Sequence, residues 1–135
     1  GEHYALTVGP DRATRMNACR TALDSGVPMA IHSDAPVTPL GPLFTAWAAV
    51  NRITASGRVQ GEEERIQVHE ALWAITMGAA YTLHLDGEIG SIETGKKADF
   101  AVLDADPTVC DPILLKDIGV WGTVQGGRIF PASNL

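Results

Sequence analysis

The stretch "MAIHSDAPVTPLGPL", from Met29 to Leu43, ends an apolar run with side chains that can do acid–base chemistry. Asp34 stands where this run meets a loop rich in proline. Enzymes with α/β folds present catalytic groups at the carboxyl ends of their strands, so we interpret Asp34 as a candidate catalytic carboxylate. The alternative is a structural aspartate that bonds nearby backbone N–H groups ahead of Pro36.

His32 precedes Asp34 by two residues, and on a strand the two side chains share one face, opposite Ser33. The imidazole is therefore a candidate substrate contact, although a lone strand histidine is more often a hydrogen-bonded structural residue. His69 and His84 each lack a second histidine two or four positions away, so we do not expect either to bind a metal.

Helical periodicity and a buried apolar run predict the elements that position these residues. Residues 10–25 have apolar side chains at helical spacing, with proline at the start and Gly26 as the stop. The run 27–33 predicts a short strand buried on both faces. Residues 43–56 and 68–83 predict two further helices, and Glu70 lies in the first turn of the second, where the helix dipole favours it.

After Gly87 the chain becomes glycine-rich and alternates apolar with polar residues, which predicts about four short strands. Gly126 and Gly127 predict a two-residue hairpin turn, because both central positions of such a turn require positive φ. The change at residue 87 divides the chain into two expected units, 1–86 and 87–135. We expect the three tryptophans, Trp47, Trp73 and Trp121, to belong to the core.

Composition limits the partners of this 135-residue chain. Its net charge of −6 and its single Lys96–Lys97 pair argue against nucleic-acid binding. No apolar run reaches the roughly 20 residues of a membrane helix, and the first ten residues do not resemble a signal peptide. We therefore expect a cytoplasmic protein with no membrane contact. Cys19 and Cys110 are too few and too far apart for a disulfide framework, so we expect buried thiols.

Two stretches together resemble one family. "HSDAPVTPLGPL" resembles the last barrel strand of metal-dependent amidohydrolases, in particular of the branch that cleaves N-acyl and N-formyl amides. "GEIGSIETGKKADFAVLDADP" resembles the strands that follow that barrel. Between them, "RIQVHEALWAITMGAAYTL" resembles the helix that leads out of the barrel, and "TVQGGRIF" resembles the closing hairpin.

The resemblance implies an α/β fold. It makes residues 1–86 the last segments of a (β/α)₈ TIM barrel, and residues 87–135 strands of a small composite β-sandwich. It also implies one or two divalent metals, commonly zinc, at the barrel mouth. In that family the aspartate that ends the eighth strand binds the metal and takes a proton from the attacking water, and here that residue is Asp34. His3 falls where the branch has a variable loop over the barrel mouth, which makes His3 a candidate substrate contact. The alternative, which we favour, is an exposed histidine near the end of the chain.

The chain departs from the family in what it lacks. The His-x-His of the first strand, the bridging residue and the histidines of the fifth and sixth strands have no counterpart in it. A barrel takes about 250 residues, so we expect this chain to be the carboxyl-terminal part of such an enzyme and inactive alone. We also expect a homo-oligomer, or contact with the missing barrel segment.

Three hypotheses follow. In the first, the chain is part of a hydrolase that acts on carbon–nitrogen bonds other than peptide bonds, in a small-molecule amide substrate. In the second, it is a non-catalytic piece or subunit that serves assembly or binding. The third is a different enzyme class. The sequence does not support it, because it contains neither a glycine-rich phosphate loop nor a nucleophile elbow.

Overall fold

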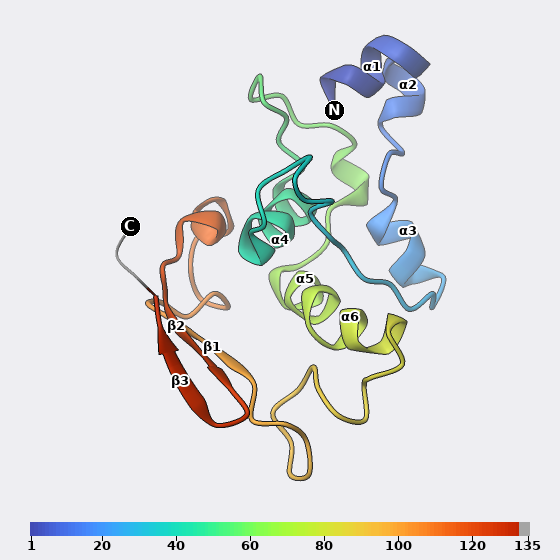
Figure 1. The fold of residues 1–135 in the computed structure, drawn as a ribbon. Coiled ribbons are helices and arrows are strands. Elements are labelled where there is room, and N and C mark those ends of the chain that lie inside the picture. The colour runs from blue at the N-terminus through green and yellow to red at the C-terminus, as the bar shows by residue number, and fades with distance from the viewer. Residues whose placement is uncertain (133–135) are drawn as a thin grey trace.

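The computed structural model describes residues 1–132 and consists of a helical part with a small antiparallel sheet at one side (Figure 1). The helices are α1 (Glu2–Val8), α2 (Pro10–Ala13), α3 (Cys19–Asp24), α4 (Pro42–Asn51), η1 (Glu62–Glu64), α5 (Val68–Ile75), α6 (Met77–Thr82) and η2 (Pro112–Asp117). The strands are β1 (Phe100–Leu103), β2 (Val120–Gln125) and β3 (Arg128–Pro131), in the order β1-β2-β3. The expected unit 87–135 ends outside the described residues.

Helix α4 is the centre of the core, and α5 and η2 pack against it. Its buried face carries Ala46, Trp47, Ala49 and Val50. Leu115 of η2 is fully buried in the same cluster, and the indole Nε1 of Trp47 donates to the carbonyl of Ile113 at 2.9 Å. The segment between β1 and β2 is thereby attached to the helical part (Figure 1).

The sheet confirms the predicted hairpin. Gly126 and Gly127 have φ of 53° and 80° between β2 and β3, as a tight turn requires. The side chain of Asp99 accepts a hydrogen bond from the backbone N of Gly126 at 2.7 Å, so Asp99 has a structural role at this turn. Three strands form among the described residues, not four, because no part of residues 87–99 is a strand of the sheet.

The predicted strand at 27–33 is wrong for this chain. These residues are not assigned to a strand, and the backbone groups of residues 28–33 make no backbone–backbone hydrogen bond with the described residues. The apolar residues 5–8, which could have supplied a neighbouring strand, belong to the helix α1. A strand needs a neighbouring chain to complete its hydrogen bonds, and none is present in residues 1–132.

The predicted helix 10–25 is interrupted. It forms as α2 and α3, and residues 14–18 between them leave the helix, with Asn17 at φ 51°. The carbonyls of Thr14, Met16 and Asn17 accept hydrogen bonds from the guanidinium of Arg52, and no backbone N four positions later donates to them. The stop at Gly26, with φ 68°, is confirmed.

The predicted helix 43–56 ends early, at Asn51. Arg52 takes a left-handed conformation, with φ of 54°, and the chain returns through an isolated bridge between Ile53 and Val59. A left-handed residue cannot continue a right-handed helix, and the buried bonds of the Arg52 side chain hold it in this position.

The predicted helix 68–83 breaks at Thr76, with φ −120° and ψ −88°, into α5 and α6. Glu70 closes a capping box with Gln67 at its start, which confirms the expected place of Glu70 in the first turn. Just after the break, Gly78 lies against the carbonyl oxygen of Met29, where no side chain would fit. This close approach sets α6 against the extended segment 27–33.

Only one tryptophan is in the core. Trp47 is buried, but Trp73 and Trp121 are 40% and 51% exposed, so the expectation for these two is wrong. Their outer faces meet no other part of residues 1–132. The thiol expectation is closer, since Cys19 is buried and Cys110 is partly buried.

No helix within residues 1–132 is long and apolar enough to cross a lipid bilayer. The longest, α4, has 10 residues.

Gly78 tests the close approach of α6 to residue 29. Helix propensity favours alanine over glycine by about 1 kcal/mol, but overpacking against a main-chain oxygen and the Trp73 ring, 2.9 Å away, costs roughly 1–3 kcal/mol. We expect Gly78→Ala to lower the urea midpoint of unfolding. Gly87→Ala is the matched control, because a Cβ at Gly87 meets nothing within 4 Å. Equal midpoints for the two variants would contradict the packing described for Gly78.

Candidate functional site

His32 and Asp34 lie together in a groove of about 850 Å³. One wall is the extended segment and the turn after it, residues 29–38. The other wall is the interruption between α2 and α3, residues 16–19, and the floor is α4 with Arg52. Gly1 and Tyr4 close one end.

The carboxylate of Asp34 is available for chemistry. Asp34 is exposed, with φ 53°, at the start of a turn closed by Val37 N donating to its carbonyl at 2.8 Å. Its backbone N donates to Nδ1 of His32 at 3.0 Å. The carboxylate itself accepts no hydrogen bond from residues 1–132, so the alternative of a carboxylate held by nearby N–H groups is not what the structure shows.

His32 therefore orients the turn at Asp34, and its imidazole faces the same groove. Because Nδ1 accepts a hydrogen bond, the neutral ring carries its proton on Nε2. The ring is exposed, so Nε2 can reach a bound molecule. Ser33 also lines the groove, and its carbonyl accepts a hydrogen bond from Thr38 Oγ1.

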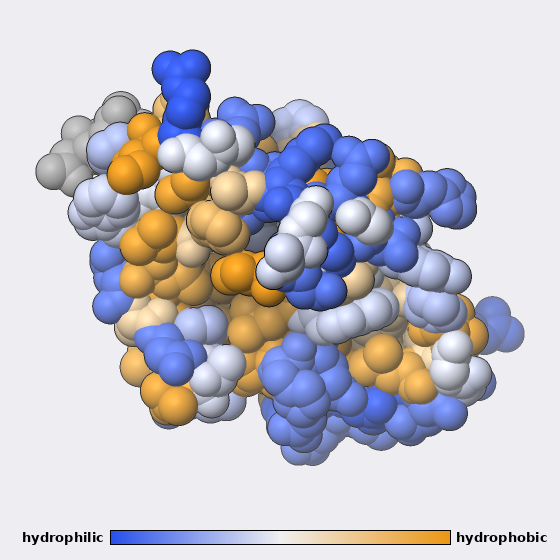
Figure 2. Space-filling view, turned by 90° about the horizontal axis from the view of Figure 1, so that it is seen from below, coloured by the Kyte–Doolittle hydropathy of each residue, from blue (hydrophilic) through white to orange (hydrophobic). Residues whose placement is uncertain are grey.

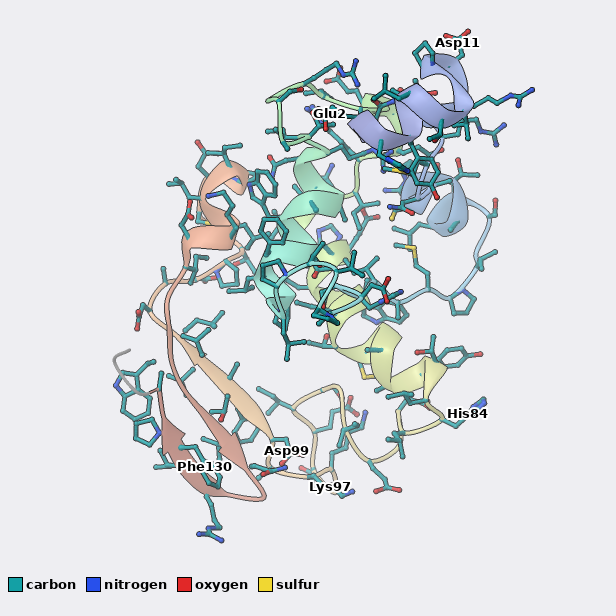
Figure 3. The ribbon with its side chains drawn as sticks, turned by 45° about the horizontal axis from the view of Figure 1, so that its top comes forward. Glu2, Asp11, His84, Lys97, Asp99 and Phe130 are labelled. Carbon is teal, nitrogen blue, oxygen red and sulfur yellow. The ribbon has the colours of Figure 1, made fainter. Side chains whose placement is uncertain are left out.

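His3 is not brought to the other two residues. It is exposed on α1, and its neighbour Tyr4, not His3, lines the groove. Glu2 holds this helix in place, because its carboxylate accepts hydrogen bonds from the N and Oγ of Ser56 (Figure 3). Bonds from the Ser56 and Thr54 hydroxyls lower the pKa of Glu2 to about 2. Substrate contact by His3 stays a prediction.

Sequence reasoning missed two buried charged residues. They hold residues 14–21, which include the wall at 16–19. Arg52, 9% exposed, donates to the carbonyls of Met16 at 2.6 Å, Asn17 at 3.0 Å and Thr14 at 3.2 Å, and its Nε donates to Gln60 at 2.7 Å. Glu64, 4% exposed, accepts hydrogen bonds from Thr21 N at 2.9 Å and Thr21 Oγ1 at 2.5 Å. The hydrogen bonds from Thr21 lower the pKa of Glu64.

The sequence contains little that would have pointed to these residues. Glu64 is the last of three consecutive glutamates and looks like part of a solvated acidic turn. Arg52 follows an apolar helix and looks like a surface residue at its end. The one available signal is Gly61, with φ 68°, because a side chain there would clash with the carbonyl of Thr14.

The groove does not hold a complete metal site. Asp34 and His32 are two candidate ligands, and residues 1–132 contain no group of three His, Cys, Asp or Glu side chains that could hold an ion. A structural or catalytic zinc normally takes three or four protein ligands. The donor set in the described residues therefore does not fit a metal by itself.

Comparison with known proteins identifies the family. The model of the amidohydrolase family matches residues 1–131. The chain belongs to the amidohydrolase family. This family is generally metal-dependent.

The relatives of this amidohydrolase chain are considerably longer. It is 34% identical to amidohydrolase YtcJ of Bacillus subtilis (strain 168) over 125 residues, which are 90% of this chain and 24% of that protein. It is 36% identical to an N-substituted formamide deformylase of Arthrobacter pascens over 108 residues, 80% of this chain and 20% of that protein. The chain thus spans a quarter or less of these curated relatives.

Part of a solved structure is similar to this chain. An amidohydrolase from Thermotoga maritima MSB8 aligns with a TM-score of 0.64 and 25% sequence identity, covering 84% of this chain and 26% of that one. The expected α/β class and its likeness to an amidohydrolase structure are confirmed. The barrel, the sandwich and the boundary at residue 87 stay predictions.

A zinc titration tests the incomplete donor set. We expect the purified 135-residue chain to bind Zn²⁺ more weakly than roughly micromolar, because two ligands cannot replace the three or four of a closed site. Competition with a chromophoric chelator measures this affinity, and Asp34→Ala should leave it unchanged. Micromolar or tighter binding that Asp34→Ala abolishes would show that the chain holds a complete site.

The lowered pKa of Glu64 predicts a pH dependence of stability. A depressed carboxyl pKa stabilises the folded chain above the ordinary glutamate value, about 4.3, and this contribution is lost as the pH falls through the folded-state pKa. Glu64→Gln should therefore lower the urea midpoint at about pH 7 and reduce its fall toward about pH 3.5. Glu63→Gln is the control, because Glu63 is exposed. The same pH profile for Glu64→Gln and the unsubstituted chain would rule out this role.

Proposed function

We propose that this chain is the carboxyl-terminal section of a metal-dependent hydrolase that acts on carbon–nitrogen bonds other than peptide bonds. The observation that carries the proposal is Asp34, an exposed carboxylate free of hydrogen bonds from residues 1–132 at the mouth of a groove. Membership of the amidohydrolase family and the likeness to an N-substituted formamide deformylase support a small-molecule amide as substrate.

In this proposal Asp34 is the general base. Its carboxylate accepts a proton from the water that attacks the amide carbonyl, and it returns the proton to the nitrogen as the carbon–nitrogen bond breaks. His32 contacts the substrate through Nε2, and its Nδ1 keeps the Asp34 turn in position. Asp34 would also be one ligand of a divalent metal, for which we propose zinc, and the remaining ligands would come from outside residues 1–132.

We propose further that segment 28–33 and the strands β1 to β3 are the last barrel strand and part of a composite β-sandwich. The unpaired backbone of the segment supports the first assignment. The apolar side chains on both sheet faces support the second, since Ile129 and Phe130 are adjacent on β3, alternate between faces, and are 62% and 44% exposed. We place the protein in the cytoplasm, as its sequence predicts.

The second candidate function is a non-catalytic subunit or piece that serves assembly. The incomplete donor set favours it for the isolated chain. The two functions differ in whether a longer protein containing this chain hydrolyses an amide through Asp34.

Replacement of Asp34 tests the catalytic proposal. In the longer enzyme that contains this chain, we expect Asp34→Asn to reduce kcat for an N-alkyl formamide by about 10²–10⁴-fold, because the amide cannot accept the proton. Asp11→Asn is the control, since Asp11 is exposed at the outer end of α2 (Figure 3). Release of formate measures the rate. Full activity in Asp34→Asn would remove Asp34 from the reaction and favour the assembly function.

The exposed apolar surface predicts that another polypeptide covers it, either a second copy of this chain or the rest of the barrel; we call this the proposed cover. Figure 2 shows apolar residues gathered on part of one face. Among all the described residues, the most exposed large apolar side chains are those of Leu6, Leu40, Ile92, Val109 and Val37, at 77–86%. Because exposing such surface is unfavourable by about 25 cal/mol per Å², we expect the isolated chain to self-associate at micromolar concentration. Sedimentation velocity over a concentration series measures this. A compact monomer with a concentration-independent thermal transition would contradict the proposed cover.

A further inference from the structure

Residues 16–19 form one wall of the groove, and the first three of them belong to no helix or strand. A wall of this kind needs another part of the chain to hold it, because its carbonyls have no regular partners. From the end of α4, the guanidinium of Arg52 donates three hydrogen bonds to the carbonyls of Thr14, Met16 and Asn17. Its Nε donates a fourth to the carbonyl of Gln60. The wall is therefore fixed to the floor of the groove through one side chain.

Two independent features support the same arrangement. Gly61 brings the chain after Gln60 so close to Thr14 that any side chain at Gly61 would clash, and its Cβ would lie 3.1 Å from Nη2 of Arg52. Glu64 then binds Thr21 in α3, just beyond the wall. Residues 14–21 are thus held by hydrogen bonds from Arg52 and by contacts with the segment 60–64.

We propose that Arg52 is a positioning residue of the candidate site: its guanidinium sets the distance between the wall at Met16–Cys19 and the wall that carries His32 and Asp34. The distance between the two walls decides how well a substrate fits the groove, so Arg52 affects KM more than kcat. A planar fork with five N–H donors can bind several carbonyls in fixed directions, whereas a lysine ammonium at the same place cannot reproduce them. The effect on substrate rests on the proposed function, but the effect on the wall does not.

Cys19 reports the state of the wall. It is 7% exposed, it lines the groove at the end of the wall, and its thiol belongs to the core cluster. Cys110 lies in a different segment, between β1 and η2, and serves as the internal reference. Iodoacetamide labelling followed by peptide mass spectrometry gives the two rates separately in one sample of the full chain.

We expect Arg52→Lys to raise the labelling rate of Cys19 by about tenfold or more, with Cys110 unchanged, because local opening exposes only the wall. Arg58→Lys is the matched control, since Arg58 is exposed and its Nη2 donates to Gln60 Oε1 at 3.3 Å. Glu64→Gln, which keeps an acceptor for Thr21, should raise the Cys19 rate less than Arg52→Lys does. An unchanged Cys19 rate in Arg52→Lys would overturn the proposal. A parallel rise of both cysteines would also overturn it, because Arg52 would then stabilise the whole chain and not the wall.

Kinetics in the longer enzyme test the consequence for substrate. With an N-alkyl formamide as probe, Arg52→Lys should raise KM several-fold, by about fivefold, and leave kcat within about twofold. A fall in kcat with KM unchanged would overturn the positioning role. If the unsubstituted enzyme hydrolyses no amide, the proposed function fails, while the labelling result still decides whether Arg52 holds the wall.

Discussion

A buried guanidinium has to be surrounded by acceptors, and in this chain the acceptors of Arg52 are main-chain carbonyls. That requirement ends α4 in a left-handed residue and keeps residues 14–18 out of the helix that their sequence favours. It also brings the segment after Gln60 to the same place. The hydrogen bonds that the Arg52 guanidinium needs therefore fix the wall at residues 16–19 relative to α4.

The second constraint is the attachment of the sheet to α4. Three strands with apolar side chains on both faces have little cover of their own, and η2, in the connection between β1 and β2, is the part that enters the core. Leu115 fills a fully buried position, and Asn51 Nδ2 donates to Pro112 at 2.9 Å beside the Trp47 bond. Helix α4 thus carries the floor of the groove on one side and the anchor of the sheet on the other.

The distribution of chemistry agrees with the size of the chain. An amidohydrolase relative is about four times as long as the matched segment, and the described residues contribute a carboxylate and an imidazole to the groove but no complete metal site. Segment 28–33 has backbone groups without partners beside the same groove. The incomplete donor set and this extended segment lie at the same groove, so a chain that paired with the segment would also bring residues close to Asp34.

Local features of this protein were determined by its sequence alone. The glycine pair at the hairpin, the stop at Gly26, the place of Glu70 in a first turn and the turn that begins at Asp34 all depend on neighbours within a few residues. The family resemblance is of the same kind, because it is carried by short continuous stretches. Only the tertiary structure decided where helices break and whether 27–33 becomes a strand. Those outcomes depend on partners that are distant in sequence. Arg52 lies 35 residues or more from the carbonyls of Thr14, Met16 and Asn17 that it binds, Met29 lies against Gly78, and a strand needs a neighbour that residues 1–132 do not provide. Periodicity records which face of an element is apolar, but not which distant group will satisfy its backbone.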